Sequence, residues 1–128
     1  MEKRRERILL VDDEANVRTV FSDVLSRESY MVKGVQGGPE AIKAIEEETF
    51  DLALVDLRMP YMDGIEVLEN IKRVKPQLPV IIYTGCGSVA SAVESIRKKA
   101  ADYLNKPFSP DELKLSIRKV LGGTGERG

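Results

Sequence analysis

Short runs of apolar residues alternate with longer amphipathic stretches along the 128-residue chain. Continuous apolar runs lie at residues 8–11, 52–55 and 80–83, and weaker runs lie at 30–35 and 102–104. Continuous apolar runs of this length are typical of strands that are buried on both faces of a sheet. The alternation therefore predicts five strands, each followed by a helix.

The stretches between these runs repeat their apolar residues at helical spacing. Ser109 and Glu112 have the spacing of a capping box, and Pro110 suits the first helical position of the last helix. The third helix must stop near Lys75 because Pro76 follows it. The residues expected to face the core are Val17, Val20, Phe21, Val24 and Leu25; Ala41, Ile42 and Ile45; Ile65, Leu68 and Ile71; Val89, Val93 and Ile96; and Leu113, Ile117, Val120 and Leu121.

Five strand–helix units in succession favour a parallel sheet that is covered by helices on both faces. Right-handed crossovers leave few topologies for such a sheet, and we choose the flavodoxin-like strand order 2-1-3-4-5, although periodicity alone does not fix the order. We therefore predict a single α/β domain, a doubly wound (βα)5 sheet, over residues 1–121. The glycine-rich residues 122–128 have the composition of a flexible tail or linker stub.

Chemically active side chains follow four of the predicted strands. Asp12 and Asp13 follow the first strand, and Asp56, Thr84 and Lys106 follow the third, fourth and fifth. In an open parallel sheet, ligands bind beyond the carboxyl ends of the strands. These five side chains are therefore expected to converge on one rim of the sheet.

The residue types on this rim indicate chemistry with a divalent cation and a phosphoryl group. Clustered carboxylates repel one another unless a cation neutralises them, and oxygen ligands without histidine favour Mg²⁺. A carboxylate can itself be the nucleophile that forms an aspartyl phosphate. Lys106 supplies a positive charge and Thr84 a hydroxyl donor for phosphoryl oxygens.

The net charge and the amino-acid composition exclude several classes of function. The formal net charge of −1 gives no strong attraction to nucleic acid or an anionic membrane. The chain has no histidine, so catalysis by histidine is excluded, and its one cysteine, Cys86, suits a reducing compartment. No signal peptide and no apolar run of membrane-spanning length is present, so we expect a cytoplasmic protein without a membrane partner.

Four segments of the chain resemble the motifs of receiver domains from two-component response regulators. They are Leu10-Val-Asp-Asp-Glu14, Val55-Asp-Leu-Arg-Met-Pro-Tyr-Met-Asp-Gly64, Tyr83-Thr-Gly85 and Tyr103-Leu-Asn-Lys-Pro-Phe108, in the family's order and spacing. The resemblance covers about residues 6 to 121. It implies a phosphorylation-dependent switch, not an enzyme with an external substrate, because such a domain catalyses only its own phosphorylation and dephosphorylation.

The resemblance also implies a role for each residue of the rim. Asp56 would be the phospho-acceptor, and Thr84 and Lys106 would bind the phosphoryl group. Thr84 and Tyr103 would form the switch that reports the phosphoryl group. Lys106 and Pro107 would be joined by the family's cis peptide bond, which an X-Pro bond makes accessible.

Cofactor and partners follow from the same resemblance. Asp12, Asp13, Asp56 and the backbone carbonyl of Arg58 would hold Mg²⁺. The phosphodonor would be a sensor histidine kinase, and the output a downstream effector domain or protein. The Thr-Gly-x-Gly sequence at 84–87 is similar to receivers of transcription activators, which often form homodimers through the fourth helix, fifth strand and fifth helix. Transcription regulation without direct contact between this chain and nucleic acid is therefore expected.

Other interpretations of these residues stay open at this point. Asp12 and Asp13 could cap the following helix, and Tyr103 could be a packing residue. A Mg²⁺-dependent phosphatase of the haloacid-dehalogenase type would need a second acid where Arg58 stands, and a guanidinium cannot act as a general acid at neutral pH. A module for interaction or dimerisation that never meets phosphate is the third alternative.

Overall fold

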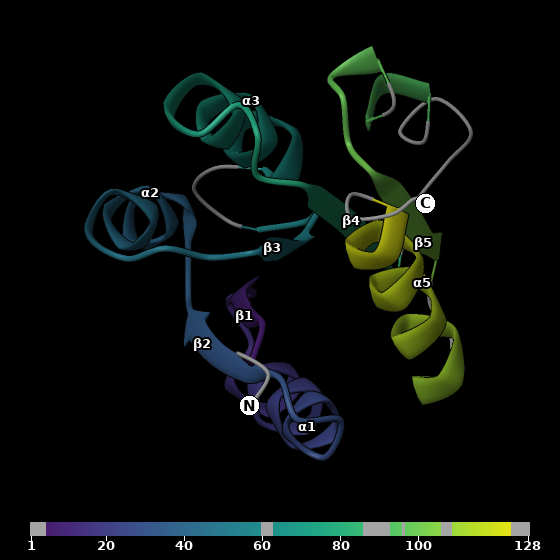
Figure 1. The fold of residues 1–128 in the computed structure, drawn as a ribbon. Coiled ribbons are helices and arrows are strands. Elements are labelled where there is room, and N and C mark those ends of the chain that lie inside the picture. The colour runs from purple at the N-terminus through teal and green to yellow at the C-terminus, as the bar shows by residue number, and fades with distance from the viewer. Residues whose placement is uncertain (1–4, 60–62, 86–92, 96, 106–108, 124–128) are drawn as a thin grey trace.

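Parallel strands form the centre of the fold (Figure 1), in a computed structural model that describes residues 5–59, 63–85, 93–95, 97–105 and 109–123. Every neighbouring pair in the sheet is parallel, and the order is β2-β1-β3-β4-β5. The predicted flavodoxin-like order 2-1-3-4-5 is confirmed. The strands are β1 (Arg7–Val11), β2 (Met31–Val35), β3 (Leu52–Asp56), β4 (Val80–Thr84) and β5 (Asp102–Asn105).

Helices cover both faces of the sheet, so the predicted α/β class is also confirmed. The helices with defined bounds are α1 (Ala15–Ser26), α2 (Gly38–Glu47), α3 (Gly64–Val74) and α5 (Pro110–Gly123). Residues 93–95 and 97 are helical as well and belong to the predicted fourth helix. None of the helices in the described ranges has both the length and the apolarity needed to cross a membrane.

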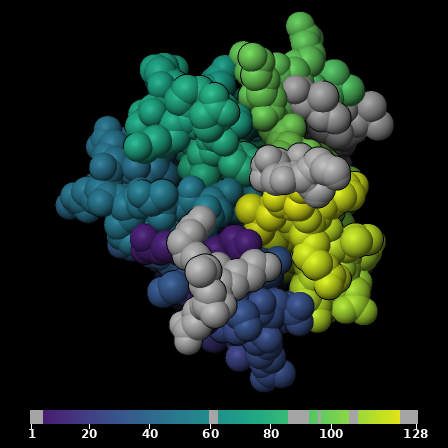
Figure 2. Space-filling view, viewed as in Figure 1, coloured from purple at the N-terminus to yellow at the C-terminus, as the bar shows by residue number. Residues whose placement is uncertain are grey.

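Two hydrophobic clusters fill the space between the sheet and its helices. Side chains alternate between the two faces of each strand, so Leu9, Val55 and Ile82 pack under α2 and α3, while Leu10 and Leu54 pack under α1 and α5. On the face shown in Figure 2, the purple N-terminal residues lie between the blue atoms of the segments that follow them and the yellow atoms of α5. Burial of the central strands on both faces fixes the sheet and hence the positions of the strand ends.

The prediction that a residue faces the core is wrong at two positions. Val20 is 56% exposed and Val93 is 49% exposed. On α1 the buried face is set by Leu25, with Phe21 and Val24 partly buried beside it. Val20 is five residues before Leu25, which places it about 140° around the helix from Leu25 at 3.6 residues per turn, at the outer margin of the buried face.

The predicted helix boundaries agree with the hydrogen bonds at the helix ends. The amide of Glu112 donates to Ser109 Oγ at 3.1 Å, and the amide of Ser109 donates to Glu112 Oε1 at 2.8 Å. The capping box of α5 is therefore confirmed. The third helix ends at Val74 with Lys75 as its C-cap, directly before Pro76, as predicted.

Candidate functional site

Three carboxylates meet at the carboxyl ends of the central strands. Asp12 and Asp13 directly follow β1, and Asp56 is the last residue of β3. One carboxylate oxygen from each of the three lies within 4.8 Å of the others. The register explains this meeting, because Val11 pairs with Val55 and the next residue of each strand is an aspartate.

Asp12 is held by hydrogen bonds at each of its polar groups. Its backbone amide donates to the Val35 carbonyl at 3.1 Å, and its own carbonyl accepts from Arg18 Nη1 at 2.7 Å. Its Oδ1 accepts from the Glu14 amide at 2.8 Å, and its Oδ2 accepts from the Tyr83 hydroxyl at 2.6 Å. The side chain is 0% exposed. The orientation of this carboxylate is therefore fixed by the protein.

The alternative role of Asp12 as a helix cap does not match these bonds. The N-cap of α1 is Glu14, whose own side chain makes no capping hydrogen bond. The Asp12 carboxylate instead bonds the amide of Glu14 itself, in a local turn before the helix begins. Asp13, one residue before the N-cap, is exposed. Neither bond of the Asp12 carboxylate is therefore a cap of α1, and Asp13 is open to solvent at the rim.

Asp56 is positioned by a close contact between α3 and the end of β3. A Cβ atom at position 64 would lie 2.6 Å from the Asp56 carbonyl oxygen, so only glycine fits there. The Gly64 amide donates to the Leu57 carbonyl at 2.8 Å. Asp63 caps α3 in a capping box, which fixes where that helix begins. The Asp-Gly pair of the sequence motif therefore places the start of α3 directly against the end of β3, which carries Asp56.

Asp56 remains accessible although it is nearly buried, with 8% exposure. The backbone amide of Arg58 donates to Asp56 Oδ1 at 3.2 Å. This bond places the Arg58 peptide beside the acids, while the metal contact expected from the Arg58 carbonyl stays a prediction. The Arg58 side chain is exposed.

The two residues expected to form the switch lie on β4 and β5, which are neighbours at one side of the sheet. Thr84 is fully buried at the end of β4, and its register partner in β5 is Asn105. Tyr103 packs against the cluster under α2 and α3, and its buried hydroxyl has no hydrogen-bond partner among the residues that the structure describes. Lys106 and Pro107, and the cis bond expected between them, lie outside the described residues.

Sequence reasoning missed Tyr83, which was assigned only to a buried strand. Burial raises the pKa of the Tyr83 hydroxyl far above its ordinary value, and the charge of Asp12 raises it further. The hydroxyl therefore stays protonated and acts as the donor to Asp12. The sequence did hold one signal, because Tyr83 is the polar residue of an otherwise aliphatic run. Its pairing with Asp56 is seen only in the structure.

The electrostatics of the cluster favour a cation. Asp12 and Asp56 are both nearly buried, and two like charges within 4.8 Å repel by at least about 3 kcal/mol at an effective dielectric constant of about 20. Three carboxylates supply hard oxygen ligands, which suit Mg²⁺ bound through a few protein oxygens and waters. The donor set therefore fits Mg²⁺ beside a carboxylate that can act as a nucleophile.

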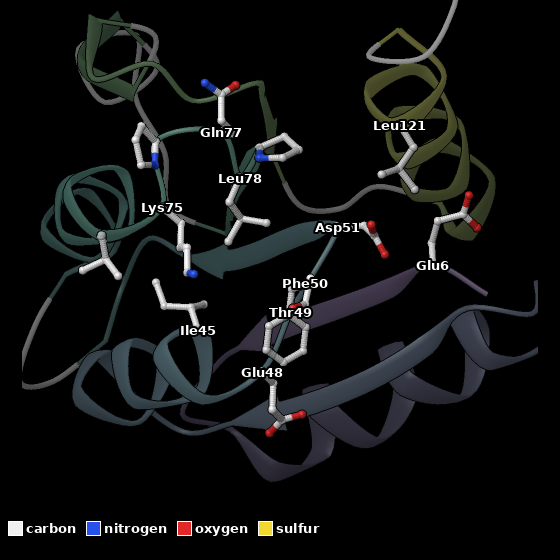
Figure 3. Close-up of a pocket in the computed structure, with 13 residues that line it drawn as sticks. Glu6, Ile45, Glu48, Thr49, Phe50, Asp51, Lys75, Gln77, Leu78 and Leu121 are labelled. Atoms are coloured by element: carbon white, nitrogen blue, oxygen red, sulfur yellow. The ribbon is translucent and has the colours of Figure 1, made fainter. Parts of the chain in front are cut away.

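A hollow of about 510 Å³ lies at the amino ends of the strands, opposite the acidic rim (Figure 3). Glu48 and Asp51 lie in its lining, before the amino end of β3. Both already have partners, since Glu48 is ion-paired with Arg7 and Lys33, and Asp51 Oδ2 accepts from the Arg7 amide at 2.8 Å. None of the predicted site residues that the structure describes lines this hollow.

Comparisons with known proteins agree with the fold and the motifs. The family model of the response regulator receiver domain matches residues 8–118. The transcriptional regulatory protein ZraR of Klebsiella oxytoca is 41% identical over 117 residues, which cover 91% of this chain and 26% of that protein. The chain therefore belongs to the response regulator receiver domain family, and the resemblance found in the sequence is confirmed.

Solved structures support the same assignment. The crystal structure of a CheY-like receiver domain protein from Methanospirillum hungatei matches with a TM-score of 0.88 at 34% identity, covering 92% of this chain and 94% of that one. The receiver domain of a putative Luxo repressor protein from Vibrio parahaemolyticus gives a TM-score of 0.87 at 37% identity, with 92% and 91% covered. The chain spans only about a quarter of the length of the ZraR relatives that it matches.

Proposed function

We propose that this domain is a phosphorylation-dependent switch that accepts a phosphoryl group on Asp56 with the help of Mg²⁺. One observation carries the proposal: three carboxylates from two neighbouring strands lie within 4.8 Å of one another in a receiver domain. Nothing in the described residues favours the phosphatase or the phosphate-independent module.

The chemistry is a transfer between two anions. A carboxylate oxygen of Asp56 attacks the phosphorus of the donor, the bond from phosphorus to its leaving group breaks, and the electron pair departs with that group. With a phosphohistidine of a sensor kinase as donor, the leaving group is the imidazole. Bound Mg²⁺ would supply the positive charge that screens donor from acceptor. Water later hydrolyses the acyl phosphate and restores the carboxylate.

Each residue of the rim takes one part in this proposal. Asp12, Asp13, Asp56 and the Arg58 carbonyl hold the cation, and the fixed orientation of Asp12 supports that role. A carboxylate with donors on both oxygens still offers further lone pairs to a cation or its water. Asp56 is the one carboxylate of the three that both holds the cation and attacks the phosphoryl donor.

The switch converts the phosphoryl group into a change of surface. Thr84 and Lys106 contact the phosphoryl oxygens, and Tyr103 follows the movement of Thr84. A phosphoryl group shifts a two-state equilibrium only through contacts that differ between the two states. The buried Tyr103 hydroxyl, without a partner among the described residues, is compatible with a side chain that has a second favourable position.

The partners are those of a cytoplasmic two-component pathway. A sensor histidine kinase supplies the phosphoryl group, and an effector domain or protein receives the signal. Relatives named as transcriptional regulators support an output in transcription control. A homodimer through the predicted fourth helix, β5 and α5 is the proposed active assembly.

Labelling with acetyl phosphate and Mg²⁺ tests the acceptor. Mass spectrometry should find one phosphoryl group per chain in the wild type and in Asp23→Asn, which alters an exposed aspartate of α1. Asp56→Asn should take up none, because an amide is not a competent nucleophile here. Full labelling of Asp56→Asn, or no labelling of the wild type, would contradict the proposal.

A further inference from the structure

Tyr83 connects the acidic rim to the core under α1. Its hydroxyl donates to Asp12 Oδ2 at 2.6 Å, 71 residues away in the sequence, and the bond is buried. Asp12 and Tyr83 come from strands that are separated by β3. The bond therefore joins two strands that do not pair with each other.

The position of this hydroxyl is fixed by its surroundings. The Tyr83 side chain is 0% exposed, and its ring meets the Phe21 ring edge-to-face, with 5.3 Å between centroids and 60° between planes. The Tyr83 backbone carbonyl accepts from the Leu57 amide at 2.8 Å, so its strand is tied to the segment that follows Asp56. A donor held in this way does not follow a carboxylate that moves away from it.

The Asp12 carboxylate depends on that donor. Its other oxygen, Oδ1, accepts from the Glu14 amide at 2.8 Å, and both bonds together fix the plane of the carboxylate. A hydrogen bond to a charged group is stronger than one between two neutral groups. Without the hydroxyl, Oδ2 would lose this donor in a fully buried position, and the carboxylate would be free to turn.

We propose that Tyr83 is a positioning residue of the cation site, which holds Asp12 in the orientation that binds Mg²⁺. The inference rests on the proposed function, because it assigns Asp12 to the cation. Groups that orient a metal-binding carboxylate typically contribute about 10- to 100-fold in metal affinity. Removal of the hydroxyl therefore weakens Mg²⁺ binding by about tenfold or more.

Calorimetric titration with Mg²⁺ tests the role directly. The wild type, Tyr83→Phe and Tyr30→Phe form a matched series, because each variant removes one tyrosine hydroxyl. Tyr30 precedes β2 and lies near the amino end of that strand, away from the acidic rim. We expect a dissociation constant about tenfold or more higher for Tyr83→Phe than for the wild type, and no change for Tyr30→Phe.

A spectroscopic signal separates positioning from general loss of structure. The chain has four tyrosines and no tryptophan, so its near-ultraviolet absorption reports tyrosine. Cation binding at Asp12 alters the carboxylate that the Tyr83 hydroxyl contacts, so Mg²⁺ should produce a tyrosine difference spectrum. That spectrum should survive both Tyr30→Phe and Tyr61→Phe, which also keeps the test available if Tyr83→Phe does not fold.

The outcomes distinguish the two proposals. Equal Mg²⁺ affinity in the wild type and in folded Tyr83→Phe would overturn the role of Tyr83 and leave the cation site intact. Loss of the difference spectrum in Tyr30→Phe or Tyr61→Phe, with Tyr83 unchanged, would also overturn that role. A wild type that binds no Mg²⁺ would overturn the cation site and, with it, the role of Tyr83.

Discussion

Gly64→Ala is the substitution that most sharply tests how the fold positions Asp56. The added Cβ would lie 2.6 Å from the Asp56 carbonyl oxygen, 2.6 Å from Leu57 Cα and 3.1 Å from the Asp56 carbonyl carbon. All three are backbone atoms, so no rotamer change can relieve the contact. Either α3 moves outward or the end of β3 moves, and both carry a cost.

The expected cost is that of inserting a methyl group into a closely packed region. Such overpacking destabilises a protein by about 1–3 kcal/mol. For a chain of this size, that corresponds to a Tm lower by roughly 4 to 12 °C. Because the strained atoms belong to Asp56 and its neighbour, phosphorylation by acetyl phosphate should also become slower than in the wild type.

Gly122→Ala is the matched control. Position 122 lies in the last turn of α5, and a Cβ there would meet nothing within 4 Å. Alanine is a better helix former than glycine by about 1 kcal/mol, so the control should keep or slightly raise the Tm and label as the wild type does. A Gly64→Ala protein with the stability and labelling rate of the wild type would refute this account of how Gly64 positions Asp56.

Two further substitutions test the ends of the secondary structure. Hydrogen bonds from Lys33 and then Arg7 hold the pKa of Glu48 below its ordinary value. The contribution of these bonds to stability is present at neutral pH and is lost as the pH falls through the lowered pKa of Glu48. The Tm difference between the wild type and Glu48→Gln should therefore shrink in acid. A Tm difference that does not change with pH would contradict this pairing. Asp63→Ala removes the cap of α3 and should cost about 1 kcal/mol in denaturant unfolding followed by circular dichroism, and an unchanged midpoint would count against the capping box.

The sheet and the acidic rim could be predicted because a short apolar run identifies a buried strand, and the end of that strand gives the position of the residue that follows it. Runs such as 52–55 identify buried parallel strands, and the carboxyl ends of parallel strands share one edge. The aspartates at 12, 13 and 56 could therefore be brought together without coordinates. The exact strand order needed the family resemblance or the structure, since helical and strand periodicity do not contain it.

What could not be predicted depends on contacts between distant elements. Val20 has helical spacing with its neighbours, yet the face that α1 buries is decided by the sheet beneath it, and this residue lies outside that face. The bond from Tyr83 to Asp12 needs the register of three strands at once. A single sequence shows the alternation within a strand but not the register between strands.

The most direct test of the account is to locate the divalent cation with Mn²⁺ as a paramagnetic probe. In an NMR spectrum, the amide signals of residues close to bound Mn²⁺ broaden. The acidic residues at the carboxyl ends of the strands can then be compared with those at the amino ends in the same protein. The account predicts broadening at residues 12–14 and 56–58, and none at Glu48 and Asp51 beside the hollow of Figure 3. Broadening confined to Glu48 and Asp51, or no specific broadening at all, would contradict it.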